Sequence, residues 1–332
     1  MRALILGDAT RPCGWHHAVG DRRPVGDRGR GGIARMNLDE SAVSGLLRMQ
    51  EVIPAMERSL ADFSSGRVVQ PVRTMLPVAE HQGFLGLMPA YTGSALGTKL
   101  VCFYPHNSGV PTHHATILLF KPETGEPLAI LDGRLITEVR TAAVSAVATE
   151  HLARSDASVL AIIGSGVQAR SHLEALTLVR EFGEVRVWSP RRAAAFAREH
   201  GVLAAASAEE AVRGADVVVT ATTSPTPVLS GDWLSPGAHV NAVGAPRPDW
   251  RELDDELLRR ARVYVDSREA AMKESGDVIA AGEIFAEIGE VAAGTKPGRR
   301  SAEEVTLFKS LGLAVEDVAT AELVYRRALA NA

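Results

Sequence analysis

The sequence predicts an α/β fold in which a doubly wound parallel sheet forms the centre and the flanking chain forms a second, α+β domain. Two patterns and the chain length lead to this prediction. Strand-like and helix-like segments alternate between residues 159 and 266, which is typical of a parallel sheet covered by helices. Between residues 68 and 132, strand-like segments follow one another through tight turns, which predicts an antiparallel sheet. A chain of 332 residues is long enough for two such domains.

Composition argues against several classes of protein. The formal net charge of −4 does not favour binding to nucleic acid or to an anionic membrane. No apolar run of the sequence approaches the roughly 20 residues that a membrane span requires. Cys13 and Cys102 have neither metal-site nor disulfide spacing, which favours a reducing compartment. We therefore expect a cytoplasmic protein without a metal site.

Residues 1–35 differ from the rest of the chain. They carry seven Arg against three Asp and show no periodicity after a short apolar start. Such a segment cannot bury enough apolar surface to offset the entropy of ordering it. We expect a disordered extension here and a folded part that begins near Met36.

In the first half of the folded part, the spacing of the apolar residues changes once, from helical to strand-like. Residues 37–63 predict helices capped by Asn37 or Asp39. Their apolar stripe consists of Val43, Leu46, Leu47, Ile53, Met56, Leu60 and Phe63. After a Ser-Ser-Gly turn, strands are predicted at 68–78, 83–90, 97–104, 115–121 and 128–132. An Ala-rich helix at 137–153 then leads into the central domain.

The central domain alternates between strands and helices. Strands are predicted at 159–163, 185–188, 216–221, 238–243 and 262–266. Helices are predicted at 167–181 and 191–200, and a short one begins at Ser207 with Glu210 completing a capping box. Residues 267–300 predict helix and loop. Residues 301–329 predict a final helical pair that returns to the first domain.

The turn after the first central strand carries a dinucleotide-binding pattern. A buried strand, Val159–Ile163, is followed at once by a glycine turn and a helix, in the order G-x-G-x-x-A. Gly164 allows the tight turn, and Gly166 lets the backbone approach a pyrophosphate, as in a Rossmann domain. The helix start would bind the phosphates through its free N–H groups. The predicted cofactor-binding residues of this turn are Gly164, Ser165, Gly166, Val167 and Gln168.

The end of the second central strand favours one form of the cofactor. An NAD site usually has an acidic residue there for the ribose 2′-hydroxyl. This chain has Ser189, Pro190, Arg191 and Arg192 instead. Two guanidinium groups can bind a 2′-phosphate. We therefore expect NADPH as the cofactor, with Ser189, Arg191 and Arg192 at its 2′-phosphate. NADH stays possible as the cofactor. The two arginines could also be the solvated start of a helix.

Many further motifs resemble one protein family. They are Gln70–Thr74, Met88–Tyr91, Thr98–Leu100, Asp132-Gly133, Arg140–Ala143, Asn241–Gly244, Arg247–Asp255, Lys273–Asp277, Glu283–Glu290 and Leu307–Gly312. Together with the glycine turn, they resemble the ornithine cyclodeaminase/mu-crystallin family over about residues 37–330. The Arg247–Asp255, Lys273–Asp277 and Glu283–Glu290 runs resemble the ketimine reductase branch in particular.

The resemblance implies an architecture and an activity. Residues 36–139 and 306–332 would form a split α+β domain that binds substrate and makes a homodimer, and residues 140–305 the Rossmann domain. The reaction would be NAD(P)H-dependent reduction of a cyclic ketimine carboxylate. Candidate substrates are piperideine-2-carboxylate and pyrroline-2-carboxylate, which would give pipecolate and proline.

Three cations are the predicted substrate-binding and catalytic residues. Arg73 and Lys99 interrupt predicted strands, and Arg140 lies near the start of the Ala-rich helix. All three match carboxylate-binding positions of the family. Arginines can hold the α-carboxylate in a fixed orientation. A partly buried lysine shifts its pKa readily, so Lys99 is the predicted proton relay. Each cation, taken alone, could also lie on a solvated face.

Other positions are assigned by the resemblance or by their place after a strand. The predicted cofactor contacts, to which Arg140 is added, are Thr112, His113, Thr222, Val243 and Ser310. Thr222 and Val243 lie at carboxyl ends of parallel strands, where doubly wound sheets bind ligands. Glu274 matches a family position in the substrate pocket, although it could equally be a solvated helix carboxylate.

Alternative functions stay open. Ornithine cyclodeaminases carry an aspartate two residues beyond the Val-Gly pair, where this chain has Pro246. Without that carboxylate the second ammonium of ornithine has no partner, so ornithine deamination is disfavoured. An alanine dehydrogenase or a reductive aminase of 2-oxo acids would use the same fold and cations. A non-catalytic binder of small ligands, as in mu-crystallin, is the alternative that is not an enzyme.

Overall fold

The computed structural model describes residues 36–332, so the prediction for residues 1–35 lies outside the described residues. One of its two sheets has six strands in the order β1-β6-β5-β4-β3-β2. The strands are β1 (Met36–Leu38), β2 (Thr74–Val78), β3 (Gly83–Tyr91), β4 (Leu96–Phe103), β5 (His113–Phe120) and β6 (Pro127–Asp132). Strands β2 to β6 are antiparallel, as predicted, and β1 adds a parallel edge to β6.

The second sheet has eight strands, all parallel, in the order β13-β12-β14-β11-β10-β7-β8-β9. They are β7 (Val159–Ile163), β8 (Glu184–Trp188), β9 (Leu203–Ala204), β10 (Val217–Thr220), β11 (His239–Ala242), β12 (Ala261–Val265), β13 (Ala286–Glu287) and β14 (Val305–Lys309). From β7 the chain adds β8 and β9 on one side and then β10 and β11 on the other. This reversal confirms the doubly wound fold, and in such folds ligands bind at the carboxyl ends of the strands, here beside β7.

Helices cover both sheets. The longer ones are α2 (Met49–Ser64), α3 (Arg134–Leu152), α4 (Val167–Val179), α5 (Ala193–His200) and α11 (Ala314–Ala330). The shorter ones are α1 (Glu40–Leu46), α6 (Ala208–Val212), α7 (Asp255–Arg260), α8 (Arg268–Glu274), α9 (Gly276–Ala281) and α10 (Ile288–Ala292). Asp39 and Ser207 cap α1 and α6 by accepting backbone N–H bonds, as predicted. Across residues 36–332, no helix is both long enough and apolar enough to span a membrane.

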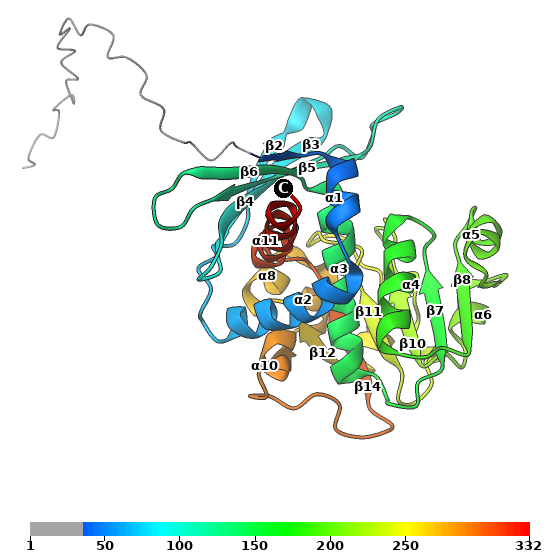
Figure 1. Ribbon diagram of the computed structural model, residues 1–332. Helices are drawn as coiled ribbons and strands as arrows, with labels where there is room; N and C mark the ends of the chain where they lie inside the picture. Colours follow the sequence, from blue (N-terminus) through cyan, green and yellow to red (C-terminus); the bar gives the residue numbers. More distant parts are fainter. Residues whose placement is uncertain (1–35) are drawn as a thin grey trace, which may run out of the picture. The chain divides into compact units, whose positions relative to one another are not determined.

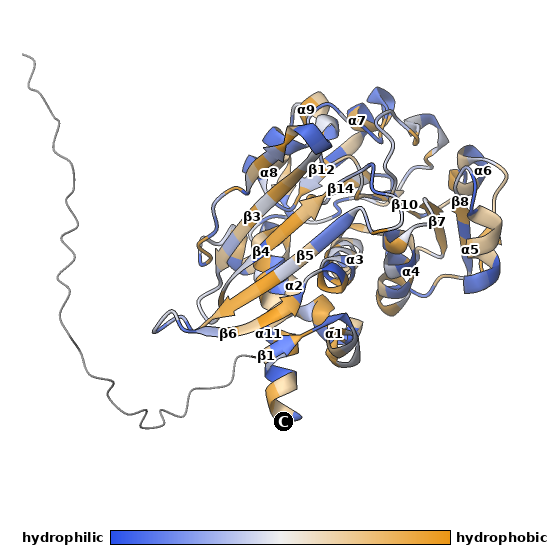
Figure 2. Cartoon of the chain, turned by 90° about the horizontal axis from the view of Figure 1, so that it is seen from above, coloured by the Kyte–Doolittle hydropathy of each residue, from blue (hydrophilic) through white to orange (hydrophobic). Residues whose placement is uncertain are grey.

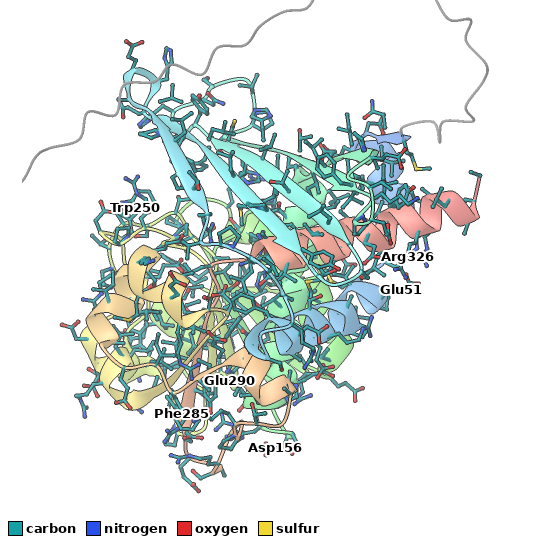
Figure 3. The ribbon with its side chains drawn as sticks, turned by 90° about the vertical axis from the view of Figure 1, so that its left-hand side faces the viewer. Glu51, Asp156, Trp250, Phe285, Glu290 and Arg326 are labelled. Carbon is teal, nitrogen blue, oxygen red and sulfur yellow. The ribbon has the colours of Figure 1, made fainter. Side chains whose placement is uncertain are left out.

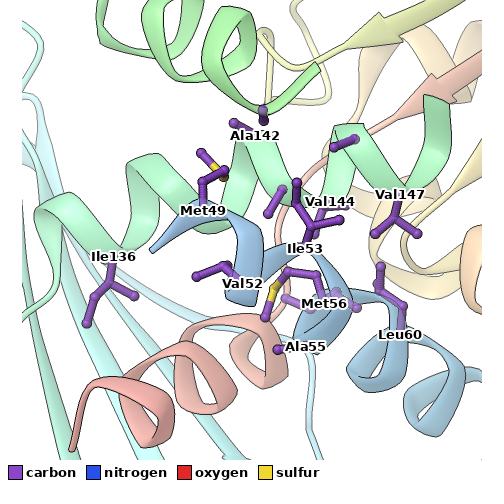
Figure 4. Packing of buried hydrophobic residues seen from close by; sticks show 14 of the residues in the cluster. Met49, Val52, Ile53, Ala55, Met56, Leu60, Ile136, Ala142, Val144 and Val147 are labelled. Atoms are coloured by element: carbon purple, nitrogen blue, oxygen red, sulfur yellow. The ribbon is translucent and has the colours of Figure 1, made fainter. Parts of the chain in front are cut away.

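Helix α3 joins the two sheets. It contacts β5 of the six-stranded sheet as well as β11 and β14 of the eight-stranded sheet. Side chains of α2, including Ile53, Met56 and Leu60, pack against Val144 and Val147 of α3, as Figure 4 shows. Helix α11 lies beneath the six-stranded sheet and contacts β3, β4 and β5 (Figure 1). The buried face of that sheet therefore looks onto α11 and α3, from which site residues come.

The C-terminal segment differs from the prediction. Residues 301–329 were expected to form a helical pair, but Val305–Lys309 is strand β14, between β11 and β12, and one helix follows. All five residues of β14 are buried, and a short buried run cannot be distinguished from helix by periodicity. Lys309 fits there because its Nζ pairs with Asp277 at 3.1 Å. The predicted boundaries between the two domains stay a prediction.

Candidate active site

The carboxyl ends of the parallel strands lie at one edge of the eight-stranded sheet. Gly164 follows β7, Thr222 comes shortly after β10, Val243 follows β11 and Ser310 follows β14. Most of the predicted cofactor contacts are therefore on the edge where doubly wound sheets bind dinucleotides. The Oγ of Ser310 is buried and has no hydrogen-bond partner among residues 36–332, so it is available to a ligand.

The glycine turn has the geometry that a pyrophosphate requires. Gly164 has φ +122°, and a Cβ there would lie 2.4 Å from the carbonyl oxygen of Ala221. Gly166 is the N-cap of α4, and no described side chain caps that helix. A Cβ on Gly166 would have no described atom within 4 Å, so its side is open. The uncapped N–H groups of α4 and the open space beside Gly166 fit a bound phosphate.

The end of β8 is tied to this turn. The Oγ atoms of Ser165 and Ser189 lie 2.8 Å apart, and Ser189 Oγ also accepts a hydrogen bond from the backbone N–H of Arg192 at 3.2 Å. Arg191 and Arg192 are exposed just before α5. The two guanidinium groups therefore belong to a loop that the glycine turn holds in place.

The first predicted cation contacts the loop after β14. Arg73 Nη2 donates to the carbonyl oxygens of Leu311 at 3.1 Å and Gly312 at 2.8 Å. The same atom pairs with Glu274 Oε2 at 3.0 Å. Arg73 directly precedes β2 rather than lying within a strand, because β2 begins at Thr74. The prediction of a mid-strand position for Arg73 was therefore wrong, while its contact with Glu274 is direct.

The other two cations share a carboxylate on α11. Arg140 Nε donates to Asp317 Oδ1 at 2.9 Å, and Lys99 Nζ forms an ion pair with Asp317 Oδ2 at 2.6 Å. Arg140 Nη1 also donates to Glu316 Oε2 at 2.8 Å. Lys99 is buried because it lies on the face of β4 that α11 covers. The structure thus brings Lys99 and Arg140 together through one side chain.

Gly312 connects this pair with Arg73. Gly312 has φ +80°, and a Cβ there would lie 2.3 Å from Arg140 Nη1. Asp266, at the end of β12, accepts the backbone N–H bonds of Leu311 and Gly312 at 2.6 and 2.7 Å. The loop after β14 therefore binds Arg73 through its backbone carbonyls. Arg140 fits against the same loop because Gly312 has no side chain. All three cations meet at the carboxyl edge of the parallel sheet.

Burial changes the ionisation of this cluster. Burial lowers the pKa of Lys99 to about 8, although the carboxylate of Asp317 acts in the opposite direction. Burial, with Lys99 and Arg140 nearby, lowers the pKa of His113 to about 4, so this ring is neutral at pH 7. Burial raises the pKa of Glu316 to about 7 despite its contact with Arg140. Lys99 is the cation whose proton is released closest to neutral pH.

Four residues with central contacts were missed by sequence reasoning. Asp266, Glu316 and Asp317 resemble ordinary acids after a strand or in the first turn of a helix, where the helix dipole alone would favour them. Glu252 accepts four hydrogen bonds, at 2.7–2.9 Å, from Thr220 Oγ1, both the N–H and the hydroxyl of Thr222, and Gly244 N. It thereby joins the ends of β10 and β11.

Two other positions singled out from the sequence, Thr112 and Pro246, are exposed. Thr112 is exposed before β5, and its carbonyl accepts a bond from Tyr104 N, so it lies outside the ion-pair cluster. Pro246 is exposed after β11, in the position where cyclodeaminases have an aspartate. Asp249 does not replace that aspartate, because it is exposed and pairs with Arg247 at 3.6 Å.

A cavity of about 600 Å³ lies elsewhere, at the amino ends of β12 and β14. Its wall includes Arg262, Phe285 and Glu304, and Arg262 lies over the Phe285 ring at 4.3 Å. In Figure 3, Phe285 is labelled in the lower part of the view, whereas the six-stranded sheet occupies the upper part. Parallel sheets bind ligands at the carboxyl edge, so this cavity is at the wrong edge for the predicted site.

Comparisons with known proteins agree with this geometry. The model of the ornithine cyclodeaminase/mu-crystallin family matches residues 34–332. A ketimine reductase mu-crystallin of Macropus fuliginosus is 55% identical over 287 residues, which cover 82% of this chain and 91% of that protein.

Two solved structures share the fold. One is Delta(1)-pyrroline-2-carboxylate reductase of Thermococcus litoralis in complex with NADH and L-proline, with TM-score 0.85 and 41% identity; the match covers 89% of this chain and 98% of the other. The second is an archaeal alanine dehydrogenase dimer with bound NAD, with TM-score 0.85 and 38% identity. The match covers 90% of this chain and 97% of the other. This chain therefore belongs to the ornithine cyclodeaminase/mu-crystallin family.

Proposed function

We propose that this chain is an oxidoreductase that reduces a cyclic ketimine carboxylate, such as piperideine-2-carboxylate or pyrroline-2-carboxylate, with NADPH or NADH. The observation that carries the proposal is the meeting of Arg73, Lys99 and Arg140 at the carboxyl edge of a dinucleotide-binding sheet. The relatives named above include a ketimine reductase and a pyrroline-2-carboxylate reductase, which supports the same substrate class.

Each cation has a distinct part in the proposed reaction. Arg73 and Arg140 bind the substrate carboxylate and orient the imine carbon. When bound, the reduced nicotinamide supplies a hydride to that carbon. Lys99 donates a proton to the imine nitrogen, so that carbon gains the hydride and nitrogen gains the proton to give the amine. Because the ammonium form of Lys99 is the donor and its pKa is about 8, reduction slows as the pH rises above that value.

The cofactor is held by the glycine turn and the strand ends. The N–H groups at the start of α4 bind the pyrophosphate, and Thr222, Val243 and Ser310 line the nicotinamide half. Arg191 and Arg192 favour NADPH over NADH because they lie where an acidic residue would select NADH. The relative from Thermococcus litoralis was solved with NADH, so the preference of this chain is a point to measure.

A homodimer is part of the proposal. Leu76, Leu87 and Ile130 are exposed on the face of the six-stranded sheet opposite α11, with exposed fractions of 55%, 37% and 42%. Figure 2 looks down on the six-stranded sheet, and β4 and β6 contain mostly hydrophobic residues over their two faces together. A second copy of the chain would cover this apolar surface. The archaeal alanine dehydrogenase named above is a dimer.

The low cysteine content of the chain favours a reducing compartment, so we infer a cytoplasmic location.

Alanine dehydrogenase activity, or reductive amination of a 2-oxo acid, is the second candidate. It is favoured by the 38% identity with the archaeal alanine dehydrogenase and by the fact that the three cations suit any 2-oxo or 2-imino acid. Ornithine cyclodeamination is disfavoured because Pro246 stands in place of the required carboxylate. A non-catalytic ligand binder would have no turnover, and its ligand binding would be indifferent to replacement of Lys99 by Met.

The test uses two assays. One follows consumption of NADPH with the two cyclic imine acids and with pyruvate plus ammonia or methylamine, and the other follows release of ammonia from ornithine with NAD. The proposal predicts the highest kcat/KM with a cyclic imine acid. Faster turnover of pyruvate with ammonia would favour the dehydrogenase, and cyclodeamination of ornithine would contradict the argument from Pro246. Absence of turnover with every substrate would favour the binder.

A further inference from the structure

Helix α11 begins with two adjacent carboxylates, Glu316 and Asp317, that the reaction above does not use. Both side chains are fully buried, and both contact Arg140. Asp317 alone contacts Lys99 as well. One carboxylate therefore joins the proposed proton donor to one of the proposed carboxylate-binding arginines.

The ion pairs of Asp317 are shielded from water. The exposed fractions of the Lys99 and Asp317 side chains are 3% and 0%, so their attraction is far less screened than at a surface. Removing one partner from such a pair leaves a buried charge without compensation. The Lys99 ammonium also donates a hydrogen bond to Thr137 Oγ1 at 3.5 Å.

We propose that Asp317 is a positioning residue that holds the Lys99 ammonium against Arg140 and keeps it charged at neutral pH, ready to donate its proton to the imine. The inference rests on the proposed reductase function. Asp317 does not touch the substrate in this account; it acts through Lys99 and Arg140.

The charged groups around Lys99 give the direction of the effect. Burial, Arg140 of α3 and Arg73 before β2 all favour loss of the Lys99 proton, and Asp317 of α11 opposes them. His113 of β5 is neutral above about pH 5, because its pKa is about 4. Although burial acts against it, the neighbouring Arg140 and Lys99 hold the pKa of Asp317 below its usual value, so this carboxylate stays charged. Loss of the Asp317 charge must therefore lower the pKa of Lys99.

The chain contains a matched control for this residue. Glu316 is on the same helical turn and is equally buried, and its Oε2 accepts from Arg140 as well. It forms no ion pair with Lys99. Glu316→Gln and Asp317→Asn each remove one buried carboxylate beside Arg140, but only the second removes the partner of Lys99.

The test is the pH dependence of kcat/KM for imine reduction in the wild-type enzyme and in the two variants. For Asp317→Asn we expect the fall in rate at high pH to begin at least about one pH unit lower than in the wild type. For Glu316→Gln we expect an altered KM, through Arg140, with the fall at the wild-type pH. Asp317→Asn with an unshifted pH profile would overturn the proposal and leave Asp317 a structural residue.

A second measurement does not depend on turnover or on a variant of Asp317. In the wild-type protein labelled with [15N]lysine, the Lys99 signal is assigned by its loss in Lys99→Met and titrated by NMR. We expect it to titrate near pH 8. Titration below about pH 6.5 would mean that Asp317 does not hold the charge, and would overturn the inference. A wild-type protein that reduces no imine acid would instead contradict the proposed function, whatever this titration shows.

Discussion

The two halves of the candidate active site are built in different ways. The cofactor half consists of short turns after parallel strands, and its important atoms are backbone N–H groups and the bare Cα atoms of Gly164 and Gly166. The cation half consists of long side chains, Arg73, Lys99 and Arg140, from segments far apart in the sequence. The first half depends on local backbone geometry, whereas the second depends on tertiary packing and on charge balance.

Charge balance is the clearer difference. Backbone dipoles can bind phosphate without a counter-ion in the protein. Buried cations need partners, because an unpaired buried charge costs several kcal/mol. The three cations here are accompanied by four carboxylates, namely Asp266, Glu274, Glu316 and Asp317. Changes in the cation half should therefore alter substrate kinetics and pH dependence, while changes in the glycine turn should alter cofactor binding.

The largest expected effect is in the cation half. Lys99→Met should lower kcat/KM for imine reduction by about 10²- to 10⁴-fold, because a general acid is lost. Binding of NADPH, measured by fluorescence titration, should change little, since Lys99 is outside the glycine turn. Near wild-type turnover in Lys99→Met would show that Lys99 is not the proton donor.

A pair of glycine substitutions separates strain from ligand contact in the other half. Gly164→Ala should destabilise the fold by about 1–3 kcal/mol, because its φ of +122° is unfavourable for alanine and the new Cβ meets a carbonyl oxygen. Gly166→Ala should leave the melting temperature nearly unchanged, because φ is −91° and the side is open. It should nevertheless weaken NADPH binding by about tenfold, since the Cβ enters the space of the pyrophosphate. Equal NADPH affinity of Gly166→Ala and wild type would argue against this phosphate site.

The two halves also differed in how well the sequence predicted them. The strand Val159–Ile163, the glycine turn and the start of α4 at Val167 are where the sequence placed them, because a buried strand followed by glycines and a helix is a local pattern. The antiparallel strands were also predicted from a local pattern, namely strand-like segments that follow one another through tight turns. The cations were singled out as charges in unexpected places together with the family resemblance.

Long-range features were not predictable from local pattern. Strand β14 was expected to be helical, because its burial between β11 and β12 is a property of the whole sheet. Asp266 and Asp317 were missed, since nothing in their neighbouring sequence distinguishes an acid that orders a loop or a lysine from an ordinary helix or strand terminus. Predicting them requires knowing that β12, β14 and α11 end or begin at one place.

A smaller effect is expected for Arg73→Lys. The charge is kept, but lysine lacks the second terminal nitrogen that arginine can offer to the substrate carboxylate while Nη2 contacts the loop after β14 and Glu274. We expect KM for the imine acid to rise about tenfold, which corresponds to about 1.4 kcal/mol, with little change in KM for NADPH. A rise confined to KM for NADPH would assign Arg73 to the cofactor half instead.

The smallest effect concerns the form of the cofactor. Replacing both Arg191 and Arg192 by Ala should raise KM for NADPH by about fivefold and leave KM for NADH unchanged, because exposed charges contribute little each. Steady-state kinetics with both cofactors measures this. Equal changes in the two constants would show that these arginines do not contact the 2′-phosphate.

A crystal structure of the chain with NADP⁺ and L-proline would test directly whether the two halves form one site. We expect the proline carboxylate within hydrogen-bond distance of Arg73, Lys99 and Arg140, with its α-carbon facing the nicotinamide ring. A carboxylate bound away from these three side chains, or a nicotinamide far from the loop after β14, would contradict the account.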